Sequence, residues 1–327
     1  MNHKILKNFV ENEIAKCKIL VVGDAMLDKY YFGEVTRISP EAPVPINRVL
    51  KITETLGGAA NVAHNLSLLG CKTSIAARIG SDIHGETFTK KLSELGIDFS
   101  AVIKTSQPTT TKIRVISGHQ QMMRLDFEDT TEIEGEEAEK FLSQIFLQLK
   151  NFDAVIISDY GKGICTEKVC HEIISASRRL KKIVVVDPKG NDWKKYSGAN
   201  FITPNLKEFN SILPKKIPNA DSEVATAAEQ VIKKFSLQGL VVTRSAAGLS
   251  LIDGENISHI KAKAQEVFDV SGAGDTVISV FTLALAGKID SVQSAYLANL
   301  AAGIVVAKVG TYAVSREELL DRLKAGD

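Results

Sequence analysis

Residues 19–24, with the sequence ILVVGD, form an apolar run rich in β-branched residues that ends at an aspartate. Residues 155–159 (VIISD) and 183–188 (IVVVDP) repeat this arrangement. Short, unbroken apolar runs of this kind are typical of parallel strands that are buried on both faces of a sheet. We therefore predict three buried strands, over residues 19–22, 155–157 and 183–186.

Two shorter apolar runs and five helical patterns continue the alternation of strand and helix. The runs cover 201–203 and 240–242, and the helical patterns cover 59–69, 85–95, 134–149, 166–180 and 222–235. This alternation predicts an α/β fold, with a mostly parallel sheet covered by helices on both faces. Ligands of such sheets bind beyond the carboxyl ends of the strands. The residues that fall there are Asp24, Asp159, Asp187, Asn205 and Thr243.

Residues 29–55 and 109–127 interrupt the alternation. The first segment holds three consecutive aromatic residues from Tyr30 onward, and the second alternates polar and apolar residues without room for a helix. We expect both segments to form one small antiparallel β flap, or lid, on a single domain that spans residues 1–327. Such a flap could close over a ligand and exclude water. An edge hairpin without that role is the alternative.

The composition is that of an ordinary globular protein. Of the 327 residues, 44% are hydrophobic and 24% are charged, and 40 basic residues balance 39 acidic ones to a net charge of +1. This balance gives no general attraction to polyanions, so we expect no nucleic acid partner. The longest nearly apolar stretch, 277–286, has about half the length of a membrane-spanning helix. Because the first residues also lack a signal-peptide pattern, we expect a cytoplasmic enzyme with no membrane partner.

The segment 268–276, with the sequence FDVSGAGDT, runs directly into the apolar helical stretch and carries the clearest chemistry. Its small residues leave the backbone N–H groups of a helix start bare, and these groups can hold phosphate oxygens. Asp275 falls in the first helical turn, where it could accept a hydroxyl proton as that oxygen attacks phosphorus. The alternative is a tight turn in which Asp275 is a simple helix-start carboxylate. The sequence contains no P-loop motif, and Val277 stands where GxGxxG requires a third glycine.

A second glycine pair, in the segment LGGAAN at 56–61, also opens a predicted helix. Its bare backbone would let a polyhydroxyl ligand approach closely, and Asn61 could both donate and accept a hydrogen bond. Asp24 and Asp28, which follow the first strand, could accept hydrogen bonds from sugar hydroxyls. For each of these residues a turn or cap role is the alternative.

Two further segments follow strand ends. In PNLKE, residues 204–208, Asn205 and Glu208 stand three apart at a helix start and could face phosphates and a hydrated Mg²⁺. The alternative is that these two residues form a capping box. In DYGKG, residues 159–163, Lys162 lies in a flexible loop where it could meet a transferring phosphate, or simply be solvated.

In this order, the motifs resemble those of the ribokinase-like carbohydrate kinases of the PfkB family, over nearly the whole chain. The resemblance implies an ATP-dependent phosphotransferase in which Asp275 is the catalytic base. It implies an anion hole formed by Gly272, Ala273 and Gly274. On the sugar side it implies contacts from Gly57, Gly58, Asn61 and Asp28.

The same resemblance implies the nucleotide and cation contacts. The residues expected at ATP are Asn205, Leu206, Lys207, Glu208, Thr243, Ser245, Gly248 and Asn299. Ser245 replaces a glycine that is frequent in the family. Glu208 is expected to bind Mg²⁺ through water, and Asp269 could lie at a monovalent-ion site, such as one for K⁺.

Three further segments resemble one subgroup of the family. They are GDAMLD at 23–28, RISPEAPVP at 37–45, and TTKIR at 110–114 with RLDF at 124–127. They are similar to the kinases of bacterial ADP-heptose synthesis, which serves the lipopolysaccharide core. These kinases phosphorylate the anomeric C1 hydroxyl of D-glycero-β-D-manno-heptose 7-phosphate. Arg37, Arg114 and Arg124 are each suited to hold the phosphate of such a substrate, and the sequence does not choose among them.

The resemblance also bears on partners and alternatives. In many relatives the kinase is fused to a nucleotidyltransferase with an HxGH motif, which none of the six histidines here forms. We therefore expect a stand-alone kinase that needs a separate nucleotidyltransferase. The aromatic flap strands could pair between two copies, which predicts a homodimer. A fructose- or ribose-type kinase and a non-catalytic nucleotide- or sugar-binding regulator are the alternatives, and a dehydrogenase is disfavoured because no dinucleotide fingerprint follows the first strand.

Overall fold

An eight-stranded sheet forms the centre of the computed structural model, which describes residues 2–254, 256–262, 267–308, 310 and 312–325. Its strands are β1 (Lys18–Gly23), β4 (Lys72–Ala76), β9 (Ala154–Ser158), β10 (Ile183–Asp187), β11 (Phe201–Ile202), β12 (Gly239–Thr243), β13 (Leu249–Asp253) and β14 (Asn256–Ile260). They lie in the order β14-β13-β12-β11-β10-β9-β1-β4. All neighbours from β4 to β12 pair in parallel, and only β13 and β14 are added antiparallel at the edge. The predicted mostly parallel α/β sheet is confirmed.

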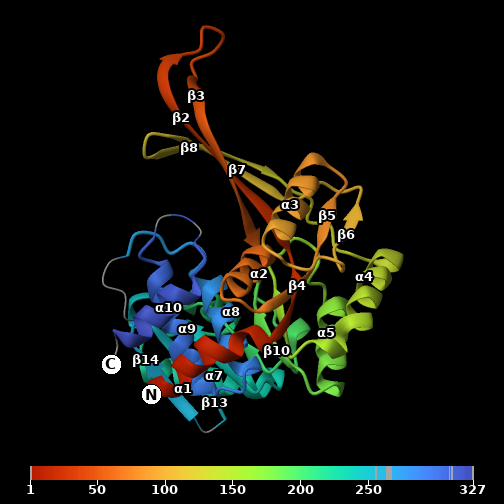
Figure 1. Cartoon of the computed structure of the whole chain (residues 1–327), viewed down its shortest axis with the longest axis vertical. Helices are drawn as coiled ribbons and strands as arrows, with labels where there is room; N and C mark the ends of the chain where they lie inside the picture. The colour runs from red at the N-terminus through yellow and green to blue at the C-terminus, as the bar shows by residue number, and fades with distance from the viewer. Residues whose placement is uncertain (1, 255, 263–266, 309, 311, 326–327) are drawn as a thin grey trace.

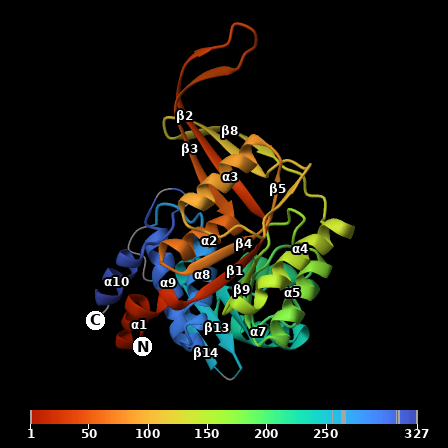
Figure 2. The same cartoon turned by 45° about the vertical axis from the view of Figure 1, so that its right-hand side comes forward.

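Helices cover both faces of this sheet (Figures 1 and 2). One face packs against α1 (His3–Asn8), α2 (Ala59–Leu68), α8 (Ala273–Ala286), α9 (Ser291–Val305) and α10 (Arg316–Lys324), and the other against α4 (Gly135–Gln148), α5 (Glu167–Arg179), α6 (Leu206–Ile212) and α7 (Asp221–Phe235). Short helical turns cover Phe9–Glu13, Ile14–Lys16, Leu149–Asn151, Lys194–Tyr196 and Ser245–Ala247. In β1, Ile19 and Val21 face the first group while Leu20 and Val22 face the second. Because both faces are covered, residues 19–22 of the strand are all apolar, as the sequence indicates.

A separate four-stranded sheet forms the flap. Its strands are β2 (Ala25–Ile38), β3 (Pro45–Gly58), β7 (Thr111–Ser117) and β8 (Gln120–Phe127), in the order β3-β2-β7-β8. The β2–β3 hairpin reaches well beyond the body (Figure 1). At its base lie α3 (Ile83–Glu94) and a small parallel pair, β5 (Arg78–Gly80) and β6 (Ile103–Thr105).

The expectation of a wholly antiparallel flap is wrong at one pairing, because β2 and β7 run parallel. The chain leaves the flap after β3 and passes through α2, β4, β5, α3 and β6 before it returns as β7. A connection of this length can bring a strand back in either direction, whereas a tight hairpin can only reverse it. Only the two hairpins, β2–β3 and β7–β8, are antiparallel.

The register gives the flap two chemically different faces. Asp28 lies opposite Lys112, and Tyr30 lies opposite Arg114, so these four side chains share one polar face. The other face carries Tyr31 with apolar neighbours on β3, β7 and β8. Among the residues described, no helix is both long and apolar enough to cross a bilayer.

Candidate active site

The start of α8 presents bare backbone amides to open space. Gly272, the residue before the helix, has a φ of 78°, a left-handed conformation that favours glycine. At Gly274, inside the first turn, a Cβ atom would meet no protein atom within 4 Å. The amides of this turn therefore border a space that side chains leave empty. Helix starts of this kind bind anions.

Asp275 lies in the same turn with only 5% of its surface exposed. Its Oδ1 accepts a hydrogen bond of 2.6 Å from the hydroxyl of Tyr160, and its Oδ2 accepts one of 2.6 Å from the amide of Asn61. Burial raises the pKa of Asp275 to about 6, although both hydrogen bonds lower it, and the charge of Asp28 raises it further. A carboxylate with a pKa in this range is ionised at neutral pH and still basic enough to accept a proton.

The structure gives Asn61 a contact that the sequence did not indicate. Its side chain is buried and its amide donates to Asp275, while the sugar contact expected of Asn61 stays a prediction. The next residue, Thr276, donates to Asn65, and Ser279, one turn after the acid, donates to the carbonyl of Val62. Helix α2 therefore fixes the position of the helix that carries the acid.

Two cavities meet at the start of α8. A polar cavity of about 160 Å³ is lined by Asp159, Tyr160, Asp187, Pro188, Lys189, Thr203, Asn205, Glu208, Thr243, Gly272, Gly274 and Asp275. A larger, more apolar cavity of about 730 Å³ shares Asn205, Thr243 and Gly274 with it. Seven of the eight residues expected at ATP line the larger cavity, namely Asn205, Leu206, Lys207, Thr243, Ser245, Gly248 and Asn299. The eighth, Glu208, lines the polar cavity.

Asn205 and Glu208 form a full capping box at the start of α6. The Asn205 side chain accepts from the Glu208 amide at 2.9 Å, and Glu208 Oε2 accepts from the Asn205 amide at 3.0 Å. The capping role weighed from the sequence is therefore present. It is compatible with a ligand role, because both residues also line the polar cavity.

Several acids face one another across the polar cavity. Burial raises the pKa of Asp187, and the nearby charges of Asp275 and Glu208 raise it further. Lys189 supplies a positive charge to the same lining. Carboxylates gathered around a small polar space suit a hydrated Mg²⁺, which prefers oxygen ligands and keeps several waters.

The structure gives Asp24 a structural role at the loop after β9. Its carboxylate is 1% exposed and accepts hydrogen bonds from the backbone amides of Tyr160, Lys162 and Ile164 at 2.9–3.0 Å. These three bonds hold the loop, and the substrate contact expected of Asp24 stays a prediction. The sequence could not show these bonds, because the partner amides lie about 136–140 residues further along the chain.

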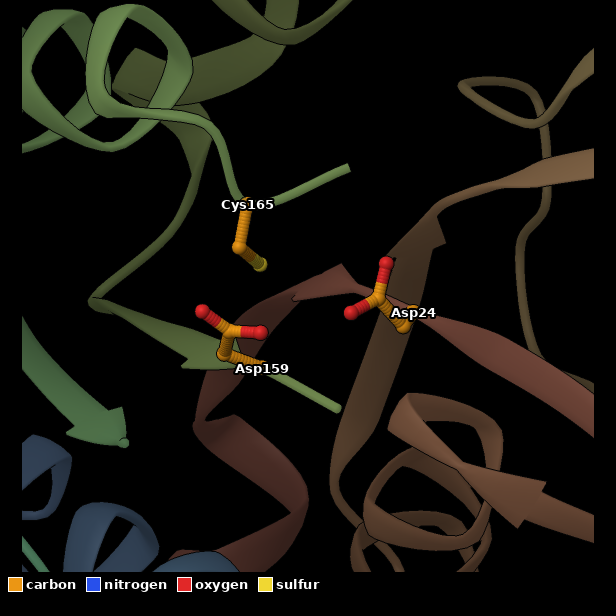
Figure 3. A group of neighbouring side chains, drawn as sticks. All are labelled: Asp24, Asp159 and Cys165. Atoms are coloured by element: carbon orange, nitrogen blue, oxygen red, sulfur yellow. The ribbon is translucent and has the colours of Figure 1, made fainter. Parts of the chain in front are cut away.

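Asp24 also belongs to a group with Asp159 and Cys165 whose potential metal-ligand atoms lie within 4.8 Å of one another (Figure 3). Protein donors already serve these acids. Asp159 accepts from the Lys195 ammonium and the Tyr196 hydroxyl, each at 2.5 Å, and Lys195 also donates to the carbonyl of Cys165. The lysine supplies the positive charge that a metal would bring, so the group anchors the loop.

The sugar-side glycines pack tightly at the base of the flap. A Cβ atom on Gly57 would clash with the Asp28 carboxylate, and one on Gly58, whose φ is 57°, would clash with the carbonyl of Asp24. Asp28 itself is buried and accepts from Arg114 at 2.5 Å. The Arg114 guanidinium also lies 5.2 Å from the ring centre of Tyr30.

Three predicted cations lie elsewhere. Arg37 is exposed near the tip of the β2–β3 hairpin, where it pairs in register with Ile46. Arg124 is half exposed and directs two hydrogen bonds to Asp126. Lys162 was expected in a loop where it could meet a transferring phosphate. It is not among the residues that line the polar cavity, and its ammonium pairs with Glu128 at 2.8 Å. Of the three candidate arginines, Arg114 is the one held beside a predicted sugar-binding acid.

Asp269 is held in a loop near the chain's far end. Its two oxygens accept from the backbone amides of Ser271 at 2.8 Å and Gly310 at 3.0 Å. These contacts fix the loop that leads into Gly272 and α8. They leave the monovalent-ion role of Asp269 a prediction.

Sequence reasoning gave no role to Tyr160, Asp187 or Lys189, although all three line the polar cavity. Asp187 was placed at a strand end, which is the signal that could have marked it. Lys189 follows two residues later, and Tyr160 follows Asp159 directly at the end of β9. The position of a residue after a buried strand therefore indicates that it lies near the site. The sequence does not show in which direction its side chain points.

Comparison with known proteins gives a family and two close sequence relatives. The profile described as pfkB family carbohydrate kinase matches residues 16–318. The protein named "Bifunctional protein HldE" from Haemophilus influenzae is 43% identical over 314 residues, which cover 96% of this chain and 65% of that protein. Its namesake from Methylobacillus flagellatus is 44% identical over 309 residues, covering 94% of this chain and 63% of that protein. The chain therefore spans less than two thirds of the length of these relatives.

Solved structures share the fold at lower identity. Phosphofructokinase-2 from Escherichia coli in complex with potassium has a TM-score of 0.78 at 17% identity, covering 94% of this chain and 98% of that chain. Ribokinase from Arabidopsis thaliana, complexed with ribose and ATP, has a TM-score of 0.74 at 19% identity, covering 94% of this chain and 99% of that chain. The expected ribokinase-like fold is thus confirmed.

Proposed function

Because the chain belongs to the pfkB family of carbohydrate kinases, we propose that it transfers the γ-phosphoryl group of ATP to D-glycero-β-D-manno-heptose 7-phosphate. The acceptor is the anomeric C1 hydroxyl, and the product is the 1,7-bisphosphate of ADP-heptose synthesis. The observation that carries the transfer step is Asp275, buried beside bare helix-start amides where a polar and an apolar cavity meet. The choice of sugar rests on the resemblance of the flap segments to the heptose kinases.

Each protein group has a definite part in this reaction. Asp275 takes the proton of the C1 hydroxyl as its oxygen forms a bond to the γ-phosphorus, and the bond from that phosphorus to the ADP oxygen breaks. The amides of Gly272, Ala273 and Gly274 stabilise the negative charge on the phosphoryl group in transit. General-base removal of this kind contributes about 10²- to 10⁴-fold in rate.

The cavities fit the nucleotide and its cation. The larger cavity, at about 730 Å³, falls in the usual size range of small-molecule sites and joins the polar cavity at Gly274. Asp187 and Glu208 would hold Mg²⁺ through its waters. When bound with the nucleotide, this ion neutralises phosphate charge. Asp269 remains a candidate for a monovalent ion, which an assay in K⁺ against Na⁺ would test.

Arg114 is our candidate for the residue that holds the substrate's own phosphate. It is the arginine that contacts Asp28, and a planar guanidinium can bind phosphate through paired hydrogen bonds. Lys112 lies on the same face of the flap, where it pairs with Asp126 and Glu128. A phosphate bound at this face would therefore meet positive charge on β7.

The test is a substrate panel read by phosphorus NMR in the presence of Mg-ATP. We expect a new C1 phosphate signal with heptose 7-phosphate, and little product with fructose, ribose or unphosphorylated heptose. In Arg114→Met, kcat/KM for heptose 7-phosphate should fall about 10- to 100-fold, since charge-assisted hydrogen bonds contribute about 1.5–3 kcal/mol. The KM for ATP should stay constant, and Arg124→Met serves as the control. Equal use of phosphorylated and unphosphorylated sugars by the unmodified protein would refute the substrate assignment.

We also propose a homodimer that forms through the apolar face of the flap. Ile52, Met123 and Leu125 share this face by register and are 42–56% exposed.

A further inference from the structure

We propose that Tyr160 is a positioning residue that orients the Asp275 carboxylate and holds it in its ionised form. This inference rests on the proposed kinase function and assigns a role to a side chain to which the sequence motifs gave none. The hydroxyl of Tyr160 donates to Asp275 Oδ1 at 2.6 Å, while Asn61 donates to Oδ2 at 2.6 Å. Each oxygen of the acid therefore has one fixed donor.

The loop after β9 is built to hold Tyr160 in place. Its backbone amide donates to Asp24 at the end of β1, and the amide of Gly161 donates to Asp159 at 2.7 Å. Asp159 is itself held by Lys195 and Tyr196. Two buried carboxylates thus anchor the backbone on both sides of Tyr160. Anchoring of this kind fixes side-chain geometry more firmly than a free loop could.

The surroundings of Asp275 explain why a donor is needed there. Burial disfavours its charge, and Asp28 on β2 adds repulsion. Asp187 on β10 and Glu208 on α6 line the same polar cavity, as does Asp159, and Lys189 is the positive residue of that lining. The nearby charges are therefore mostly negative. Hydrogen bonds from the neutral groups Tyr160 and Asn61 favour the ionised acid without adding a charge that would compete for phosphate.

The two donors also restrict where a sugar hydroxyl can bind. A carboxylate oxygen has two acceptor directions, and one on each oxygen is already taken. The attacking hydroxyl must therefore approach along a remaining direction, from the cavity that Asp275 lines together with Gly272 and Gly274. Tyr160 thus contributes to the alignment of the acid with the phosphoryl group, although it does not contact that group itself.

The test compares Tyr160→Phe with the unmodified protein in kcat measured from pH 5 to 9. Loss of the hydroxyl should move the acid limb of the profile upward by about one pH unit. The kcat on the alkaline plateau should fall about tenfold, while the KM for the sugar changes less than twofold. Tyr312→Phe is the matched control, because it removes a tyrosine hydroxyl that donates to Glu318 of α10 and not to Asp275. Its acid limb should stay in place.

A second readout does not depend on turnover. In protein labelled with carbon-13 at aspartate carboxyl groups, the Asp275 signal is assigned by its absence in Asp275→Asn. That signal should titrate at higher pH in Tyr160→Phe than in the unmodified protein. An unchanged titration and an unchanged acid limb would overturn the inference, even if the melting temperature fell. If the unmodified protein phosphorylates no sugar, the proposed function fails, and the carbon-13 titration still decides the role of Tyr160.

Discussion

The Asp275 carboxylate is held in the folded chain at a cost to stability. Its pKa rises from 3.8 to about 6 on burial. Between these values the folded state binds more protons than the unfolded state, so the free energy of unfolding falls as the pH rises. At 1.36 kcal/mol per pH unit, the free energy of unfolding is about 3 kcal/mol lower above pH 6 than below pH 4.

This cost predicts that Asp275→Asn stabilises the protein while it abolishes turnover. At pH 8 the free energy of unfolding of the variant should exceed that of the unmodified protein by up to about 3 kcal/mol, because no charge is buried. Its melting temperature should be a few degrees higher. The difference should shrink toward zero near pH 4, where the aspartate is protonated. Thermal melts at pH 4, 6 and 8 provide the measurement. A variant no more stable than the unmodified protein at pH 8 would contradict the raised pKa.

Residue roles were predictable from the sequence only where the motif itself defines the geometry. Asp275 and the glycines before it fall in one helical turn, so their proximity follows from the sequence. Asp24 and Asn61 were expected at the sugar, and the structure adds to each a partner at least 136 residues away. Local sequence carries no information about such partners.

At the scale of elements, the start of α8 separates function from stability. Gly274 occupies a helical position without positive φ, and a Cβ atom there would meet open space. An alanine is therefore free of steric conflict and is favoured in a helix by up to about 1 kcal/mol over glycine. The same methyl group would project into the space beside the amides that are proposed to hold the phosphoryl group.

Gly274→Ala should therefore raise the melting temperature slightly and lower kcat at least tenfold. Gly70→Ala, at another glycine with open space but a φ of 91°, is a control that should lose stability and keep its kcat. Calorimetry and steady-state kinetics on both variants give the two readouts. Full activity in Gly274→Ala would show that the amides of this turn do not bind the transferring group.

Elements were more predictable than their pairing. The strands β1, β9 and β10 each contain the run predicted for them, because burial on both faces makes every position apolar. The flap segments were recognisable because they interrupt the alternation of strand and helix, the first by its consecutive aromatic residues and the second by its alternating polar and apolar residues. The parallel pairing of β2 with β7 was not, since it depends on where the chain returns after the five elements between β3 and β7.

The whole molecule brings distant parts of the chain to one site. Asn61 near the start of the chain and Asp275 near its end are 214 residues apart, yet they share a hydrogen bond. The flap adds Asp28 and Arg114 from above, and the strand ends add Asp187 from below. The polar face of the flap therefore belongs to the site. On the apolar face of β8, Phe127 lies against His84 of α3, whereas Met123 and Leu125 are exposed.

That apolar face predicts the oligomeric state. Burying Leu125 and Met123 against a second copy would remove apolar surface from water at about 25 cal/mol per Å², so we expect a dimer of twice the 35.5 kDa chain mass. Leu125→Lys should dissociate it, because an ammonium group would be placed in the apolar contact. Leu147→Lys makes the same change outside the flap, on α4, where Leu147 is 78% exposed. This variant should stay dimeric. Sedimentation velocity at micromolar concentration distinguishes the forms, and a monomeric unmodified protein, or a dimeric Leu125→Lys, would refute this interface.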